Sequence, residues 1–136
     1  MKKENGSLSA KPAFRLGHEI FGAAQHTPIR FGDHLYGVRA DGKFVCLTLD
    51  GKVVWTSSPG QQFGLGSFIL ADRVLLAMND SGLLRLIEAT PERYHLLAQA
   101  QILTGGHDSW GPLALAGGRL IARDMTRMVC LDVGRH

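Results

Sequence analysis

Residues 35–47 read LYGVRADGKFVCL, and residues 49–55 continue with LDGKVVW. Each of the two turn pairs, Asp41-Gly42 and Asp50-Gly51, lies between short apolar runs. Short apolar runs separated by such turns are typical of antiparallel β-strands joined as hairpins. This part of the chain therefore predicts three consecutive strands, and it provides the pattern against which the remaining sequence is compared.

The same pattern occurs three times along the chain. Every copy begins with an apolar run, a tight turn and a second apolar run, and the turns are Gly32-Asp33-His34, Ala71-Asp72-Arg73 and Gly117-Gly118-Arg119. Units of about 40 residues with four short strands each are typical of propeller blades. The predicted fold is all-β: a β-propeller-type array of about three four-stranded antiparallel blades over residues 27–58, 67–103 and 110–133, with the last blade incomplete.

One segment allows two interpretations. Thr90-Pro91 favours the start of a helix, because threonine is a good N-cap and proline suits the first helical position. Residues 94–102, however, largely alternate between apolar and polar side chains, which favours a strand. The position in the repeat also calls for a fourth strand here, so we predict a strand.

Composition limits the class of protein. The chain has 136 residues, of which 45% are hydrophobic and 20% charged, so it can form a core. A net charge of +3 without clustering argues against nucleic-acid binding, and the longest apolar run, Val74–Met78, is too short to insert into a membrane. We expect residues 1–11 to be a flexible segment and residues 12–136 to form the partial propeller.

The first copy resembles the repeat of the PQQ-like (pyrroloquinoline-quinone-type) β-propeller proteins, in the order apolar-Tyr36, Asp41-Gly42, a Leu-Asp pair, Gly51-Lys52 and Trp55. Residues 110–132 look like the closing blade of such proteins. The resemblance extends over about residues 12–133. It implies a ring of roughly six to eight blades, so we expect the C-terminal blades of a longer propeller or a half-ring. It also implies an exported or periplasmic parent, although the chain carries no signal peptide.

The function that we favour is a non-enzymatic scaffold or protein-interaction module. One alternative is a fragment of a quinone-dependent dehydrogenase whose catalytic residues lie on other blades, and another is a propeller that binds a small ligand. We expect neither a quinone nor calcium. Cys46 and Cys130 occupy the slot that Leu86 fills in the middle copy, which predicts apolar packing and no disulfide. The six histidines form no paired ligand motif, so we expect no metal site, and no catalytic residue is assigned.

Six residues form a candidate surface for a ligand or partner: Arg39, His107, Asp108, Trp110, Arg123 and Asp124. The simpler interpretation is that Arg123 pairs with Asp124 in a turn and that Trp110 fills the gap between blades. We also expect the chain to associate with itself or with the rest of a propeller. In that hypothesis residues 12–17 are a spare strand that completes the last blade of a second copy.

Overall fold

The computed structural model describes residues 2–4, 7–105 and 107–134, and, besides a two-stranded hairpin near the N-terminus, these residues contain three antiparallel sheets that follow one another along the chain. The first sheet consists of β3 (Ile29–Phe31), β4 (His34–Val38), β5 (Phe44–Thr48) and β6 (Val53–Thr56). The second consists of β7 (Phe68–Ala71), β8 (Val74–Met78), β9 (Leu83–Glu88) and β10 (Leu96–Gln101). The third consists of β11 (Ala114–Ala116), β12 (Arg119–Arg123) and β13 (Met128–Asp132).

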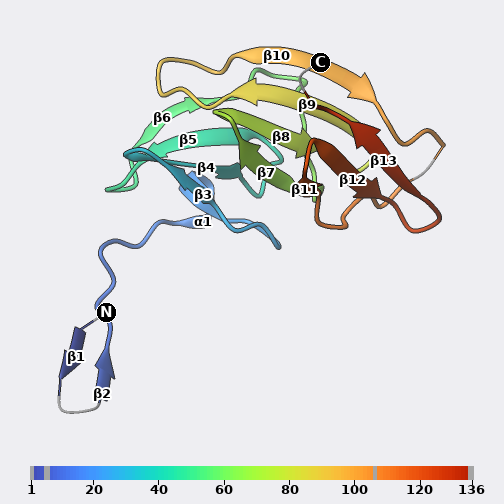
Figure 1. Ribbon diagram of the computed structural model, residues 1–136. Coiled ribbons are helices and arrows are strands. Elements are labelled where there is room, and N and C mark those ends of the chain that lie inside the picture. The colour runs from blue at the N-terminus through green and yellow to red at the C-terminus, as the bar shows by residue number, and fades with distance from the viewer. Residues whose placement is uncertain (1, 5–6, 106, 135–136) are drawn as a thin grey trace.

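Strand order within each sheet follows chain order, so every sheet is a simple meander. Figure 1 shows the three sheets as an open array, with the first sheet at one side and the third at the other. The prediction of an all-β, propeller-type array with a shorter last unit is confirmed. The strand chosen for residues 94–102 is also confirmed, because β10 occupies this segment.

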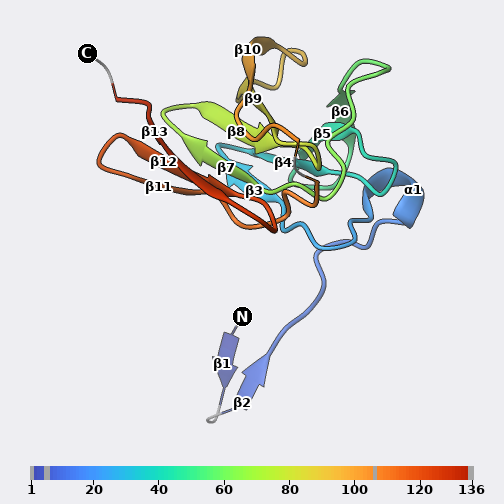
Figure 2. The same ribbon diagram turned by 90° about the vertical axis from the view of Figure 1, so that its right-hand side faces the viewer.

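The segment before the sheets contains elements that the sequence analysis did not anticipate. These are a hairpin of β1 (Lys2–Glu4) and β2 (Ser7–Ser9) and a short helix α1 (His18–Phe21). The hairpin stands apart from the sheets in both views (Figure 1, Figure 2). Whether residues 1–11 are flexible stays a prediction.

Residues 12–17 form no strand within the single chain, and whether they complete the last blade of a second copy stays a prediction. The segment instead lies against the first sheet of its own chain. A Cβ placed on Gly51 would lie 2.7 Å from Leu16, and one on Gly37 would lie 2.8 Å from the Phe21 ring. Leu16 therefore covers the turn at Gly51, and Phe21 of α1 covers the face of the first sheet that carries Gly37 and its cross-strand neighbour Val45.

Two apolar clusters hold the sheets together. The first cluster lies between the first and second sheets and contains Tyr36, Phe44, Cys46, Trp55, Phe63, Leu75 and Ile87. The second cluster lies between the second and third sheets and contains Leu76, Met78, Leu84, Leu113, Leu120 and Ala122. Successive residues of a strand point to opposite faces, so Leu75 and Leu76 reach different clusters. The inner strands of the second sheet, β8 and β9, are thus covered on both faces, whereas its outer strand β10 is exposed.

Trp55 links the first and second sheets within the first cluster. Its ring centroid lies 5.9 Å from that of Tyr36 and 5.8 Å from that of Tyr94. Its indole N–H donates a hydrogen bond to the main-chain oxygen of Thr90 at 2.9 Å, which joins the two sheets. Only 9% of Trp55 is exposed, so its expected burial between blades is confirmed.

The two cysteines have different environments. Both are free, as expected, and Cys46 is buried in the first cluster. Cys130 is exposed, so the expectation that both pack as apolar side chains is wrong for Cys130. Its cross-strand neighbour Ile121 is also exposed, because this face of the third sheet has no sheet against it among the described residues.

No helix in the described ranges is long and apolar enough to cross a bilayer.

Replacing Trp55 with alanine should lower the free energy of unfolding by about 3–5 kcal/mol. The substitution leaves a cavity and removes the hydrogen bond to Thr90, and both changes destabilise the folded state. Val53 lies on the same strand with an exposed side chain, so Val53→Ala is the matched control and should cost less than about 1 kcal/mol. Urea denaturation measures both. Equal costs for the two variants would contradict the packing described here.

The buried Cys46 thiol should make the protein sensitive to alkali. Burial raises the pKa of Cys46 from 9.0 to about 11, and a hydrogen bond with Tyr36 acts in the opposite direction. Between these values the unfolded chain loses the thiol proton and the folded chain keeps it, so stability falls as pH rises from 9 to 11. The urea midpoint of wild type should fall as the pH rises through this window, and the midpoint of Cys46→Ala should fall less steeply. If the midpoints of both proteins depend on pH with the same slope, Cys46 is not the group that makes stability sensitive to alkali.

Candidate functional site

All connections between sheets lie at one end of the array. In each sheet the second strand runs to this end, the third leaves it and the fourth, where present, returns to it. The loops between second and third strands therefore lie beside the linkers between sheets. We call this end the linker rim, and it comprises residues 22–28, 39–43, 57–67, 79–82, 102–105, 107–113 and 123–127.

The six residues of the predicted surface all lie on the linker rim. Arg39 begins the loop after β4, Arg123 is the last residue of β12 and Asp124 follows it, and the remaining three belong to the linker before the third sheet. The structure thus brings residues from three separate segments to one end of the array. Whether they bind a ligand or a partner stays a prediction.

Asp80 connects the two linkers that join the sheets, the one before the second sheet and the one before the third. Sequence reasoning did not identify this residue. Its Oδ1 accepts the main-chain N–H of Leu65 at 2.7 Å and the indole N–H of Trp110 at 3.0 Å. Its main-chain oxygen accepts the N–H of Ser109 at 3.1 Å. A Cβ on Gly64 would collide with the Asp80 carboxylate, so this position requires glycine for close approach as well as for its φ of 55°.

Trp110 does not fill a gap between blades, and this expectation is wrong. Its side chain is on the surface with 43% of the residue exposed. The indole N–H donates a hydrogen bond to Asp80. The ring belongs to neither apolar cluster. The neighbouring Gly111 lies against Arg123, since a Cβ there would be 2.8 Å from the Arg123 side chain. Trp110 and Arg123 are therefore close on the rim.

The expected pairing of Arg123 with Asp124 is also wrong. Asp124 Oδ1 accepts hydrogen bonds from the Thr126 N–H at 2.7 Å, the Thr126 hydroxyl at 2.9 Å and the Arg127 N–H at 2.8 Å. Its other oxygen lies 3.5 Å from Arg127 Nε. The Thr126 N–H is the main cause that lowers the pKa of this carboxyl. Asp124 thus closes the turn, while Arg123 remains exposed beside the linker.

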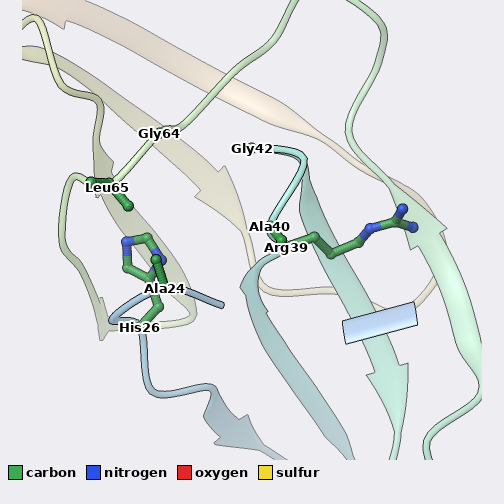
Figure 3. Close-up of a pocket in the computed structure, with 7 residues that line it drawn as sticks. All are labelled: Ala24, His26, Arg39, Ala40, Gly42, Gly64 and Leu65. Carbon is green, nitrogen blue, oxygen red and sulfur yellow. The ribbon is translucent and has the colours of Figure 1, made fainter. Parts of the chain in front are cut away.

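Two adjoining hollows lie on the rim. The first has a volume of about 230 Å³ and is lined by His26, Arg39, Gly64 and Leu65 among others. Figure 3 shows His26 beside Leu65, whereas the Arg39 side chain points away from His26. Arg39 instead pairs with Asp41 at 3.0 Å. The first hollow therefore presents an imidazole but not the guanidinium that sequence reasoning placed at a ligand surface.

The second hollow has a volume of about 350 Å³ and is lined by Gln25, His26, Leu65, Ser67, Trp110 and Pro112. Its walls are well fixed. Ser67 Oγ donates to the Gly111 oxygen at 2.8 Å and accepts the Leu113 N–H at 3.0 Å. His26 Nε2 lies 2.9 Å from the oxygen of Gly66. These bonds tie the N-terminal linker and the two inter-sheet linkers into one surface.

His107 and Asp108 lie at the edge of this surface. His107 Nδ1 is 2.7 Å from Asp108 Oδ2, and Asp108 has a φ of 62° in the linker. His107 is exposed, and among the residues that the structure describes no third titratable side chain lies at ion-pair distance from the pair. No group of three metal-ligating side chains converges anywhere in residues 2–4, 7–105 and 107–134.

Asp80→Ala should loosen the rim without unfolding the sheets. The variant leaves the Leu65 N–H and the Trp110 indole N–H without their acceptor, which should cost about 1–3 kcal/mol. Asp41→Ala, in the equivalent loop of the first sheet, is the control and should cost less. With Trp55 replaced by phenylalanine in each variant, the emission of Trp110 reports on its fixation. Unchanged anisotropy in Asp80→Ala would contradict the role of Asp80.

The comparisons with known proteins address the fold. No family model matches the chain, and no curated protein matches its sequence. The structure is similar to that of BamB from Moraxella catarrhalis, with a TM-score of 0.62 and 15% identity over 78% of this chain and 32% of that one. It is also similar to the computationally designed Ika4 protein, with a TM-score of 0.56 and 12% identity over 79% and 64% of the two chains. This chain therefore spans less than two thirds of either protein, and the likeness supports a β-propeller fold.

Proposed function

We propose that the chain is a non-enzymatic module that binds a protein partner through the linker rim, and that its repeats are of the PQQ-like type. The observation that carries the first part is the exposed but fixed ring of Trp110. Tryptophan is enriched among the residues that dominate the energy of protein interfaces. A ring that is already held in place loses little conformational entropy when a partner covers it.

The surroundings of Trp110 suit a protein surface. The second hollow places an apolar wall, formed by Leu65 and Pro112, beside polar groups of Gln25 and His26. Arg123 lies exposed near the same linker. An apolar centre with a polar and cationic edge is the usual composition of an interface between proteins that also exist apart. The partner that fits would offer an apolar side chain to the hollow and a carboxylate to Arg123.

The repeat type is supported by the roles of the motif residues in the first sheet. Tyr36 and Trp55 contact each other in the first cluster. Gly42 and Gly51, the glycines of the two turn pairs, have φ values of 78° and 87°, which favour glycine. The residues that carry the resemblance are therefore those that the packing and turns of a blade require.

Trp110→Ala should abolish partner binding and leave the fold intact. The matched control is Leu97→Ala, which removes an exposed apolar side chain from β10, outside the linker rim. Quantitative affinity capture with wild type and both variants should identify a protein whose recovery falls about tenfold or more for Trp110→Ala only. Purified, that protein should show the same loss in a titration. If every captured protein binds Trp110→Ala as well as wild type, the proposal is overturned.

A further inference from the structure

Arg85 is a buried cation without a carboxylate beside it. It lies on β9, and only 7% of the residue is exposed. Its Cζ lies 4.8 Å from the centroid of the Phe63 ring, and its Nη1 donates a hydrogen bond to the main-chain oxygen of Gln62 at 2.8 Å. Within residues 2–4, 7–105 and 107–134, no carboxylate lies at ion-pair distance from the guanidinium. Burial of a charge is costly unless an opposite charge pairs with it, so an anionic ligand would be stabilised here.

The contacts of Arg85 leave one edge of its guanidinium free. The Nε atom is buried and has no hydrogen-bond partner. The Nη2 atom, on the same edge, makes no hydrogen bond within the described part of the chain, and it is not enclosed as Nε is. Two parallel N–H donors on one edge match the two oxygens of a carboxylate. Because Phe63 and Gln62 hold the group in place, this edge is oriented before a ligand arrives.

Two further polar side chains surround this edge. Gln99 of β10 pairs across the strands with Arg85, so both side chains lie on the face of the second sheet that is turned to the first sheet. Gln99 is exposed, so its side chain can move aside to admit a ligand and donate a hydrogen bond to it. The Tyr94 hydroxyl is buried without a partner. Burial raises the pKa of Tyr94 and the charge of Arg85 acts in the opposite direction, which agrees with a hydroxyl within range of the guanidinium.

We propose that Arg85 binds a carboxylate, which is either that of a small organic acid or the acidic side chain of a protein. The carboxylate enters at Nη2 and pairs with the Nε–Nη2 edge, and the Gln99 amide and the Tyr94 hydroxyl supply further hydrogen bonds. Because the guanidinium is largely removed from water, this ion pair is screened less than one at the surface. Trp110 lies in a different linker, so the proposal does not rest on the proposed function.

Titration of the full chain with sodium acetate, followed by NMR of the Arg85 Nε–H and the Gln99 side-chain amide, tests the proposal. We expect saturable shifts of both, and none with sodium chloride at equal concentration. Arg85→Lys keeps the charge but removes the two-donor edge, so acetate binding should weaken about tenfold or more at the Gln99 amide. Arg73→Lys is the matched control, because Arg73 also lies over a ring, that of Phe31, but is exposed. Equal acetate binding by Arg85→Lys and wild type, or equal shifts with chloride, would overturn the proposal.

A second variant decides the result if Arg85→Lys does not fold. Gln99→Glu places a carboxylate opposite Arg85 at an exposed position, so it should occupy the free edge and weaken acetate binding about tenfold or more. Ala100→Glu is its control, since residue 100 pairs with Leu84 and faces the other side of the sheet. Equal acetate binding by Gln99→Glu and Ala100→Glu would overturn the proposal.

A second probe distinguishes the two sources of the carboxylate. Glutamate blocked at both ends, which carries only its side-chain carboxylate, is titrated in the same way as acetate. Saturation with acetate alone assigns the site to a small organic acid, and saturation with blocked glutamate as well assigns it to an acidic side chain. If neither probe saturates, Arg85 only ties the linker to the second sheet through Gln62 and Phe63, and the proposal is overturned.

Discussion

A sheet that is apolar on both faces must be covered on both, and this requirement organises the molecule. The second sheet presents Leu75 and Ile87 to one neighbour and Leu76 and Met78 to the other. Burial of both faces provides hydrophobic stabilisation at two interfaces. Both interfaces can form only if the three sheets pack face to face. The connections then follow, because a meander of four strands ends where it began and short linkers suffice to reach the next sheet. The linker rim is the direct result.

The pattern of the chain predicts what depends on local chemistry. Short apolar runs and turn pairs identify the strands, and the first repeat identifies Trp55 as a packing residue, since large aromatic side chains gain most from burial. The alternation in residues 94–102 correctly outweighs the helix signal of Thr90-Pro91. Repetition strengthens each of these inferences, because a strand in one copy predicts a strand in the others.

What the pattern does not predict depends on long-range neighbours. Trp110 is apolar enough for a core, but its position in a linker and its hydrogen bond to Asp80 leave it exposed. Cys130 occupies the same slot as Cys46, yet its face of the third sheet has no sheet against it in the described part of the chain. Asp80 looks like an ordinary turn residue, and its contacts come from residues 15 and 30 positions away. The positions of the six candidate residues on one rim follow from topology.

Packing on both faces rather than hydrogen bonding should set local stability, and native-state hydrogen exchange tests this most directly. β8 and β12 are both internal strands with neighbours on either side, so their hydrogen bonding is alike. β8 is covered on both faces, whereas one face of the sheet of β12 is exposed. The account predicts that amides of β8 exchange about tenfold or more slowly than those of β12. Equal protection in the two strands, or greater protection in β12, would contradict it.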